Sequence, residues 1–393
     1  MPESGIPAWE DGSWTALPPL TRNVIADVCV VGLGGSGLTC VNALLSLGRT
    51  VVGIDAGLIG GGAAGRNGGF LLAGTSEFYH DSVESLGRDR ARKLYQLTLD
   101  EISRIAADTA EVVRRTGSLR IAGSADEESD IARQLEALRH DGFSAEPYDG
   151  PEGRGLLVRD DAAFQPLGRC RLLARKAIAG GANLYEKTAA AHVDSGRVET
   201  TEGFVISCER VVVAIDGRLE VLLPELSPRV RTARLQMLAS AAAPEVSIPR
   251  PVYSRYGYDY WQQLPDKRVV VGGCRDEEMD AEWTTERSIT QTMQARLEKL
   301  LRQTIGVCQP VTHRWAAHVS FSEGELPVFE EVRKGVFAIG AYSGTGNVIG
   351  ALYGRMAAEF AATGISETAA SIGLSPARPS TPSRTPGRNT RVA

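Results

Sequence analysis

Glycines near the N-terminus have the types and spacing that bind a nucleotide pyrophosphate. Residues 26–37 read ADVCVVGLGGSG, an apolar run followed by G-x-G-x-x-G at Gly32, Gly34 and Gly37. Gly32 would allow a tight turn, Gly34 would let the backbone approach the phosphates, and Gly37 would let a helix pack closely on the strand. The free amides and the dipole of that helix would favour a negatively charged ligand.

The elements that must position these glycines follow the order strand, turn, helix, strand. We expect strands at 28–31 and 50–54 with a helix at 38–47 between them. The second strand ends at Asp55, about 20 residues beyond the glycines, where an acid can accept hydrogen bonds from a ribose. The unit predicts a dinucleotide site, since a glycine-rich loop in an unrelated fold would lack these flanking elements. It does not by itself distinguish FAD from NAD.

A second glycine-rich segment, GLIGGGAAGRNGGFLLAG at 57–74, follows directly. Its many glycines suggest backbone packed close to a flat or charged group, with Arg66 and Asn67 as polar residues inside the loop. We therefore interpret it as a second contact surface for the cofactor. The alternative is a flexible surface loop.

The C-terminal part repeats the strand, glycine turn and helix pattern. A strand at 336–339 precedes Gly340, Gly344 and Gly346, and a helix is expected at 347–362. The start of this helix again offers free amides to an electron-rich group. A nicotinamide enzyme seldom needs such a second turn, whereas FAD has two ends that both require backbone amides, so the pair of turns favours FAD.

The chain between the two turns predicts further α/β structure and then an antiparallel sheet. We expect helices at 89–115, closed by Gly117, and at 127–140, 166–179 and 283–305, with short strands at 119–122, 183–185, 188–193, 204–207 and 211–215. From Val230 on, short alternating strands separated by Pro and Gly predict antiparallel pairing. Five aromatic residues gather there, either as sheet packing or as a pocket wall: Tyr253, Tyr256, Tyr258, Tyr260 and Trp261.

Composition sets broad limits on the class of protein. A chain of 393 residues suits two domains, and a net charge of −5 argues against nucleic acid as a partner. No apolar run approaches the roughly 18 residues needed to span a bilayer, and the N-terminus carries acids and prolines where a signal peptide would be basic and apolar. The six cysteines form no C-x-x-C pair and the five histidines have no metal-ligand spacing. We therefore expect a cytoplasmic protein with reduced thiols and no metal.

Taken in order, these motifs resemble a known family, the D-amino-acid oxidase-like FAD oxidoreductases, which include glycine oxidase, sarcosine oxidase and gamma-glutamylputrescine oxidase. The resemblance runs from about residue 20 to about residue 364 and is greatest for the gamma-glutamylputrescine oxidase-like branch. It is carried by VVGLGGSG at 30–37 with Asp55, GRNGG at 65–69, VVVAIDG at 211–217, WAAHVSFSEGELP at 315–327 and IGAYSGTGN at 339–347.

The resemblance implies a discontinuous α/β domain of the Rossmann-like, glutathione-reductase type that binds FAD, and an α+β substrate domain with an antiparallel sheet. The implied divisions are an N-terminal arm (1–23), the FAD-binding domain (24–80, 150–225 and 328–366), the substrate domain (81–149 and 226–327) and a disordered tail (375–393). The implied FAD contacts are Gly32, Gly34, Gly35, Ser36, Gly37, Asp55, Ala56, Arg66, Asn67, Gly68, Gly69, Ala190, Ala214, Gly217, Gly340, Gly344, Thr345, Gly346 and Asn347.

The sequence departs from the family pattern at four positions. Asp55 replaces the more usual Glu, which should preserve ribose binding, and Ala64 stands where many relatives have Ser. Ala317 occupies the place of a cysteine that bonds the flavin in sarcosine oxidase-type members, so we expect non-covalent FAD. Val319 occupies the place of an arginine that holds the substrate carboxylate in glycine oxidase-like members, so a substrate carboxylate would have to be held elsewhere.

The family chemistry is oxidation of a C–N bond in a small amine or amino acid. A hydride passes to flavin N5, water hydrolyses the resulting imine, and dioxygen or another acceptor takes the electrons. We assign no catalytic base; Tyr258, Tyr260 and Trp261 are candidates for the pocket. The alternatives are an FAD dehydrogenase that passes electrons to a quinone or a protein, a flavoprotein kept as a binding module, and a nicotinamide dehydrogenase.

Overall fold

A six-stranded sheet forms the centre of one half of the protein. The computed structural model describes residues 3–375, so the predicted tail lies outside the described residues except for Ser375. The strand order is β11-β4-β3-β15-β22-β21, and all neighbours are parallel except β22 and β21. The strands are β3 (Val28–Val31), β4 (Val51–Ile54), β11 (Asn183–Tyr185), β15 (Arg210–Val213), β21 (Val328–Arg333) and β22 (Val336–Gly340).

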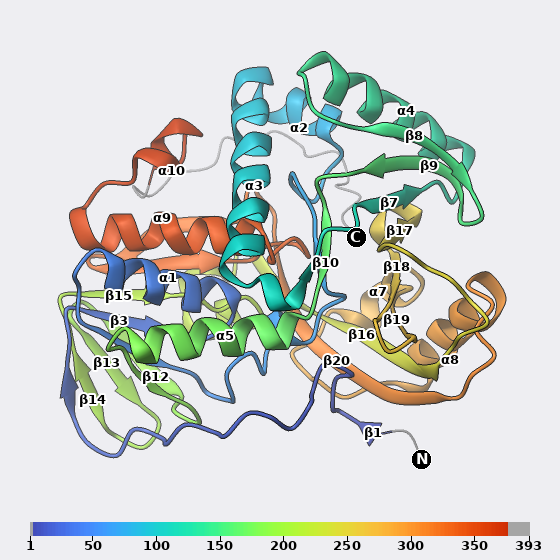
Figure 1. The fold of residues 1–393 in the computed structure, drawn as a ribbon. Helices are drawn as coiled ribbons and strands as arrows, with labels where there is room; N and C mark the ends of the chain where they lie inside the picture. The colour runs from blue at the N-terminus through green and yellow to red at the C-terminus, as the bar shows by residue number, and fades with distance from the viewer. Residues whose placement is uncertain (1–2, 376–393) are drawn as a thin grey trace.

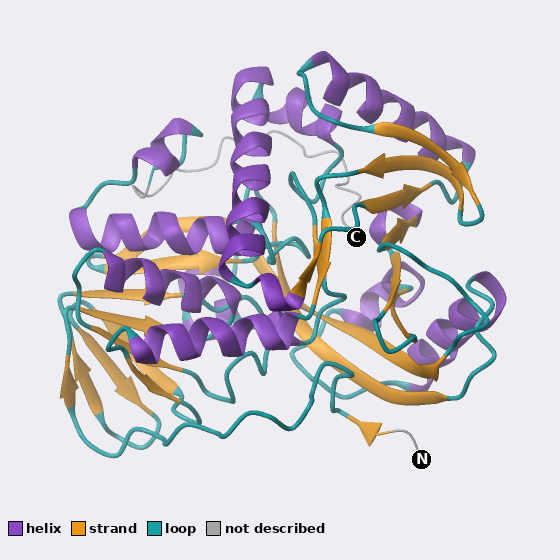
Figure 2. Ribbon diagram, viewed as in Figure 1, coloured by secondary structure: helices purple, strands orange, loops and turns teal. Residues whose placement is uncertain are grey.

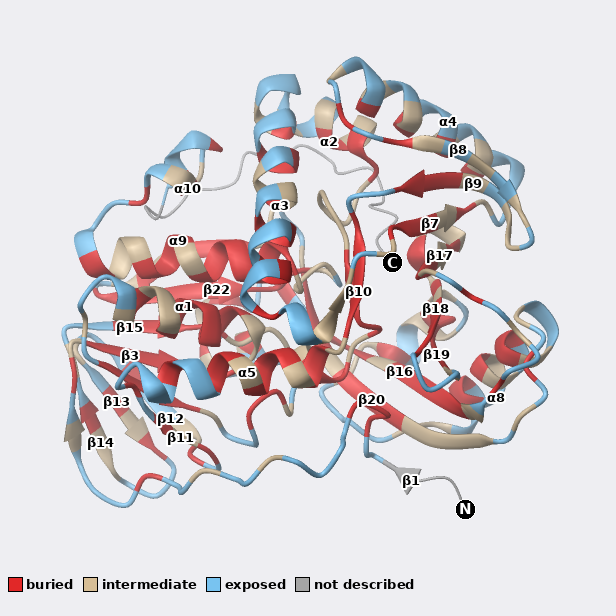
Figure 3. Cartoon of the chain, viewed as in Figure 1, coloured by how far each residue is buried: buried red, intermediate tan, exposed pale blue. Residues whose placement is uncertain are grey.

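Three helices cover one face of this sheet: α1 (Gly35–Ser46), α5 (Pro166–Ala179) and α9 (Ile349–Thr363). Figure 1 shows them side by side over the sheet. Their apolar sides and the sheet form one buried cluster, which Figure 3 shows as a red layer beneath exposed outer helix faces. A Cβ at Gly354 of α9 would lie 2.3 Å from the carbonyl oxygen of Ser36, so α1 and α9 cross in backbone contact there.

A four-stranded sheet packs on the other side of the central sheet, where Figure 2 shows its strands opposite the helices. Its order is β12-β13-β14-β2, from β2 (Val24–Ile25), β12 (Ala190–Asp194), β13 (Arg197–Thr200) and β14 (Val205–Ser207). A second apolar cluster fills the space between the two sheets. The central strands are thus buried on both faces, which is why they are apolar runs without alternation.

A nine-stranded mixed sheet of order β1-β20-β16-β19-β18-β17-β7-β9-β8 makes up the other half. Its strands are β1 (Glu3–Ser4), β7 (Ser118–Ile121), β8 (Glu146–Gly150), β9 (Gly153–Val158), β16 (Val230–Ala242), β17 (Val252–Ser254), β18 (Asp259–Gln263), β19 (Arg268–Gly273) and β20 (Val311–Ser322). Only β1 with β20 and β17 with β7 are parallel neighbours. The antiparallel pairs β16–β19, β16–β20 and β18–β19 form its centre.

A small sheet, β5-β10-β6, lies between the two large ones. It contains β5 (Phe70–Leu71), β6 (Val113–Arg114) and β10 (Ala162–Phe164). The remaining helices are α2 (Tyr79–Leu86), α3 (Arg88–Asp108), α4 (Ala125–His140), α6 (Leu219–Leu222), α7 (Met279–Glu282), α8 (Gln291–Lys299) and α10 (Glu367–Ser371). None of the helices in residues 3–375 has the length and apolarity that crossing a bilayer requires.

Two predicted helices are longer in the sequence interpretation than in the structure. The helix expected at 89–115 ends at Asp108, because Thr109 has non-helical dihedrals and Val113–Arg114 leave the helix to pair with β10. The helix expected at 283–305 begins only at Gln291, where the Thr290 hydroxyl caps it by accepting from the Met293 amide, and it continues as a π-helical turn to Thr304.

The predicted fold class is confirmed: a Rossmann-like α/β half stands beside an α+β half with a largely antiparallel sheet. The division into domains stays a proposal. Two strands cross the expected boundaries, since β9 lies in the segment assigned to FAD binding and β1 lies in the N-terminal arm, yet both join the nine-stranded sheet.

Candidate functional site

The turn before α1 leaves a row of backbone amides without side-chain caps. Gly34 is the N-cap residue, no side chain bonds the first amides, and the first turn contains no acid. Gly32 has φ +100°, and a Cβ there would lie 2.6 Å from the carbonyl oxygen of Ala214. A Cβ at Gly37 would lie only 1.9 Å from the carbonyl oxygen of Gly32. The turn therefore requires its glycines and presents the charge that a phosphate needs.

A buried arginine that the sequence analysis does not identify lies beside this turn. Arg169 of α5 is 4% exposed, and its Nη1 would lie 3.1 Å from a Cβ placed on Gly35. Its Nη2 donates to Thr39 Oγ1 at 3.4 Å, while its Nε has no hydrogen-bond partner among the described residues. Burial lowers the pKa of the guanidinium. A buried cation with so few partners at a helix N-terminus fits an anionic ligand such as a pyrophosphate.

Asp55 stands at the end of β4, as the sequence predicts. Its Oδ2 accepts from the amide of Leu33 and its Oδ1 from the amide of Gly57, both at 2.8 Å. Burial raises the pKa of this carboxyl group. Two amides leave the carboxylate with further lone pairs, so ribose hydroxyls can still donate to it. The neighbouring Ala56 is exposed, and Ala190 lies partly exposed at the start of β12.

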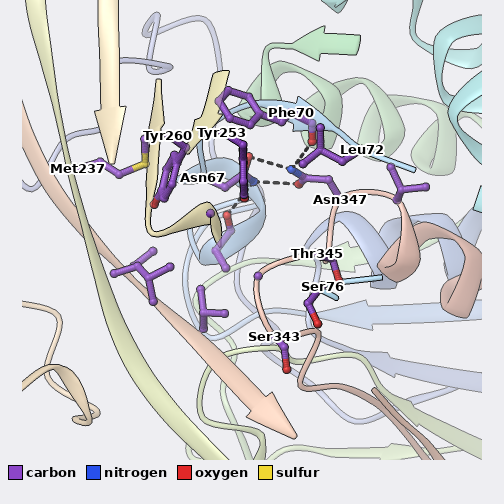
Figure 4. A pocket seen from close by; sticks show the side chains of 18 of the residues that line it. Asn67, Phe70, Leu72, Ser76, Met237, Tyr253, Tyr260, Ser343, Thr345 and Asn347 are labelled. Carbon is purple, nitrogen blue, oxygen red and sulfur yellow. Dashed lines mark hydrogen bonds between the residues drawn. The ribbon is translucent and has the colours of Figure 1, made fainter. Parts of the chain in front are cut away.

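Two asparagines join the glycine-rich loop to the C-terminal turn, although 280 residues separate them. Asn67 Nδ2 donates to Asn347 Oδ1 at 3.0 Å, and Asn347 Nδ2 donates to Asn67 Oδ1 at 3.1 Å and to the carbonyl oxygen of Phe70 at 2.8 Å. Asn67 Oδ1 also accepts from the amide of Gly69. Both segments were predicted to contact the flavin, and the structure brings them together (Figure 4).

The C-terminal turn is held by its own backbone. Gly344 has φ +90°, and the amide and hydroxyl of Thr345 donate to the carbonyl oxygen of Tyr342 at 3.0 and 2.8 Å. A Cβ at Gly346 would lie 3.0 Å from the Tyr342 ring. Helix α9 follows from N-cap Val348 with no side-chain cap and no acid in its first turn. Among its first amides, that of Gly350 donates to the carbonyl oxygen of Gly346 at 3.1 Å, and the others can face a ligand with partial negative charge.

A cavity opens where these segments meet, enclosing about 1020 Å³ of empty space with its mouth included. Arg66, Asn67, Gly68, Gly344, Thr345 and Asn347 line it from the predicted FAD contacts. The nine-stranded sheet supplies the opposite wall through residues such as Leu235, Met237, Tyr253, Tyr260, Ala317 and Val319. No Asp, Glu, His or Cys is among the described residues that line it.

The aromatic wall of the cavity is formed by Tyr253, Tyr260 and Phe70. The two tyrosine rings are stacked with centroids 5.7 Å apart, and Phe70 meets Tyr253 edge-on at 5.4 Å. Of the predicted pocket candidates, only Tyr260 lines the cavity; Tyr258 does not, and Trp261 is buried on the opposite sheet face in the cluster that includes α8. Burial raises the pKa of Tyr253 and Tyr260, so both remain neutral hydroxyl groups.

Arg66 lines the cavity, but its guanidinium is committed to the surrounding backbone. Its Nε donates to the carbonyl oxygen of Ala316 at 2.9 Å, and its Nη2 donates to that of Gly5 in the N-terminal arm. Burial lowers its pKa to about 10. The indole of Trp315 in turn donates to the carbonyl oxygen of Arg66 at 2.8 Å. These hydrogen bonds hold the 66–69 loop against β20 and the N-terminal arm.

Three of the predicted contacts pack the backbone and do not line the cavity. The backbone of Ala214 packs against the Gly32 turn, since its carbonyl oxygen would lie 2.6 Å from a Cβ placed on Gly32. A Cβ at Gly217 would lie 2.4 Å from the Cβ of His318, and one at Gly340 would lie 2.4 Å from the carbonyl oxygen of Ile215. These residues allow close approach of the strand ends around the site.

Arg120 is a further cavity residue that the sequence analysis does not identify. It lies on β7 between Leu119 and Ile121, which are both buried in the apolar clusters of the sheet. Because successive strand residues face opposite sides, this alternation places Arg120 on the polar side of β7. Only the tertiary structure shows that this side is the cavity wall.

Comparisons with known proteins agree with this geometry. The chain is 28% identical to the Rhizobium meliloti (strain 1021) protein named "Probable oxidoreductase OrdL", over 86% of this chain and 83% of that protein. It is 26% identical to the gamma-glutamylputrescine oxidoreductase of Escherichia coli (strain K12), over 86% and 84%. Among solved structures, glycine oxidase from Geobacillus kaustophilus superposes with a TM-score of 0.71 at 18% identity, covering 86% of this chain and 95% of that one.

The family itself is shown by a model that spans most of the chain. The model described as "FAD dependent oxidoreductase" (DAO) matches residues 27–360, from the strand before the first glycine turn to the last turns of α9. The two uncapped glycine turns, the buried Arg169 and the carboxyl group of Asp55 fit the cofactor that this description names. The resemblance is confirmed, and the chain belongs to the DAO family of FAD-dependent oxidoreductases.

Proposed function

We propose that this oxidoreductase oxidises the C–N bond of a small amine or amino acid. The observation that carries the proposal is the position of the cavity, which lies at the Asn67–Asn347 junction and continues along the tyrosines of the nine-stranded sheet. Two proteins similar to this chain are named for such substrates, gamma-glutamylputrescine oxidoreductase and glycine oxidase.

We propose the following residues as the holders of FAD. The amides of the first turn of α1 and the guanidinium of Arg169 would bind the pyrophosphate, and Asp55 the ribose. The 66–69 loop and the 344–347 turn would hold the ring system. When bound, FAD supplies a two-electron acceptor that takes a hydride at flavin N5. The absence of any thiol among the described cavity residues supports non-covalent binding.

The residues of the cavity support orientation of a neutral amine more than proton abstraction. With no carboxylate or imidazole on its described walls and with tyrosines of raised pKa, the cavity offers hydroxyl donors and apolar surface. Such a site can align an amine and exclude water from its α-carbon. The net reaction is amine plus water plus oxidised acceptor, giving a carbonyl compound, ammonia and reduced acceptor.

The test is anaerobic reduction of the purified protein by a panel of primary and N-methyl amines and amino acids. We expect absorbance at about 450 nm from bound flavin, which bleaches with at least one member of the panel. Protein that carries flavin but is bleached by none of them would contradict amine oxidation.

The electron acceptor is a separate question with its own measurement. We propose dioxygen, so a reduced sample opened to air should regain its colour and release one peroxide for each flavin. A reduced sample that stays colourless in air but recolours rapidly with a soluble quinone would instead identify a dehydrogenase.

Flavin attachment is tested by denaturation. Because Ala317 stands at the predicted attachment position, we expect acid-precipitated protein to release all its yellow colour into the supernatant. Colour that remains with the precipitate would contradict non-covalent binding.

A further inference from the structure

One cavity residue, Arg120, forms no ion pair with a carboxylate of the described chain; the buried Asp161 interacts with it only at longer range. Its Nη1 donates to Gln134 Oε1 at 3.3 Å, and its guanidinium carbon lies 4.8 Å from the centre of the Phe78 ring. Gln134 is 5% exposed, so this end of the arginine is held in buried surroundings. No Asp or Glu oxygen in residues 3–375 lies within ion-pair distance of it. A partly buried guanidinium of this kind favours an anionic partner.

The cavity as a whole is electropositive. Arg66 and Arg120 are its two ionised side chains, and no carboxylate is among its described lining residues. The guanidinium of Arg66 is already bonded to backbone carbonyls, whereas only a neutral amide and an aromatic face hold that of Arg120. A substrate with a second ammonium group would therefore meet like charge, and one with a carboxylate would meet opposite charge.

The register of the sheet fixes how far Arg120 lies from the 66–69 loop. On neighbouring strands, Arg120 is the partner of Tyr253, and Tyr253 is the partner of Tyr260. The Tyr260 ring lies against Gly68, where an added Cβ would be 3.0 Å from it. Two inter-strand spacings of about 4.8 Å put the backbone of Arg120 roughly 10 Å from that of Tyr260. The stacked tyrosines form a continuous wall between the two positions.

We propose that Arg120 anchors a carboxylate at the end of the substrate remote from the oxidised amine. This proposal rests on the proposed function, and it names the substrate class as small amines with a distal acid group. The planar guanidinium matches the two oxygens of a carboxylate, while the tyrosine wall covers the apolar chain between the ends. The position thereby supplies the carboxylate contact that Val319 cannot make.

The experiment compares three amines of equal chain length and different distal charge: δ-aminovalerate, pentylamine and cadaverine. In the wild-type protein we expect kcat/KM for flavin reduction to be highest for δ-aminovalerate and lowest for cadaverine. In Arg120→Met the ratio of δ-aminovalerate to pentylamine should fall at least tenfold, chiefly through KM, and Arg120→Lys should restore part of it.

The matched control is Arg154→Met. Arg154 lies on the adjacent strand β9, is exposed, and pairs with Glu128 at 2.8 Å away from the cavity. We expect it to keep the wild-type order of the three amines. Equal reduction by all three amines in the wild type, or an unchanged ratio in Arg120→Met, would overturn the anchor while leaving amine oxidation intact.

A second measurement does not depend on turnover. Valerate, which has no amine to oxidise, should perturb the flavin absorbance of the wild-type holoenzyme and bind at least tenfold more weakly to Arg120→Met. If no amine reduces the flavin but valerate binds in this Arg120-dependent way, the anchor stands and the proposed function fails. If valerate does not bind the wild type, or binds both proteins equally, the anchor is wrong.

Discussion

Arg169 has fewer hydrogen bonds than a buried guanidinium normally makes. The nearby acid that could neutralise it, Glu101, already accepts from Arg355 Nε at 3.0 and 2.9 Å. A buried charge without a close partner is unfavourable, so this cation destabilises the fold unless an anion binds beside it. A pyrophosphate at the start of α1 would accept charge-assisted hydrogen bonds from this guanidinium and so stabilise it.

We therefore expect Arg169→Met to bind FAD at least tenfold more weakly, since hydrogen bonds to charged groups contribute about 1.5–3 kcal/mol. The apoprotein should be as stable as the wild type or more so. Titration of FAD into apoprotein, followed by flavin fluorescence, checks the affinity. ADP and adenosine separate the causes, because only ADP binding should weaken; equal weakening of adenosine would point to a general structural change.

Asp161 is a buried carboxyl group that ties β9 and β10 to their neighbours. Its oxygens accept from the Ser118 hydroxyl at 2.6 Å and from the Ala73 amide at 2.8 Å. Burial raises its pKa from 3.8 to about 7. Between these values the folded protein keeps a proton that the unfolded chain has released, so the stability this residue contributes is full below the lower value and is lost as the pH rises through the higher one.

For Asp161→Asn we expect a flatter dependence of stability on pH. The wild type should lose up to about 1.4 kcal/mol per pH unit relative to this variant across that interval. Urea unfolding of the holoenzyme at pH values from 4.5 to 7.5 is the measurement. Parallel curves for the two proteins would contradict the raised pKa.

Single residues also show the limits of prediction from sequence. The glycine spacing is enough to predict that Asn67 and Asn347 lie on two glycine-rich turns, but nothing in it indicates that their side chains pair. Tyr260 and Trp261 were both expected to face the pocket, although adjacent strand residues face opposite ways, and Trp261 is buried in the core. Arg120 and Arg169 carry no sequence signal because their surroundings come from segments distant in the chain.

At the scale of elements, the βαβ unit of β3, α1 and β4 was predictable because its order is set locally. Its apolar strands, its glycine turn and Asp55 occur within one short segment. The end of α3 and the start of α8 were not predictable in this way, because the apolar periodicity continues past both boundaries. Helix α3 ends early because Val113–Arg114 pair with β10. Helix α8 begins at the Thr290 cap, which places its start eight residues later than the apolar pattern suggests.

The contact between the glycine turn and α1 gives a prediction for this unit. In Gly37→Ala the new methyl group would overlap the carbonyl oxygen of Gly32, so we expect a loss of at least about 2 kcal/mol of stability and weaker FAD binding. Gly62→Ala is the control, because no atom lies within 4 Å of its Cβ position and its φ is −87°. Thermal unfolding and flavin content measure both variants. Equal behaviour of the two would show that the turn can relax.

At the scale of the whole molecule, the N-terminal arm links the two halves. β1 pairs with β20, the indole of Trp9 donates to the carbonyl oxygen of Asn67 at 2.8 Å, and the indole of Trp14 donates to Glu186 Oε1 at 2.9 Å. Both tryptophans hold the arm against the rest of the molecule. The structure shows in addition that Trp9 is bonded to the loop that lines the cavity.

Removing the Trp9 side chain should make the 66–69 loop more mobile, because its indole holds the backbone of Asn67. Trp9 is 3% exposed, so Trp9→Ala should cost about 3–5 kcal/mol and speed release of flavin, whereas Trp9→Phe should lose mainly the hydrogen bond, about 1 kcal/mol. Ile6→Ala, at a side chain 44% exposed, is the matched control on the same arm. The melting temperature and the rate of flavin loss on dilution are measured for all three variants. A Trp9→Ala protein that keeps its flavin as long as the wild type would contradict this prediction.

The pairing of Asn67 with Asn347 has a consequence for synthesis of the protein. Strand β22 and the turn after it leave the ribosome long after β3, yet β22 lies beside β15 in the same sheet as β3. The part of the cavity wall that Gly344, Thr345 and Asn347 supply is therefore absent until this turn has been made. A nascent chain can form its first glycine turn early, but after Asn67 it must grow by 280 residues before the two asparagines can meet.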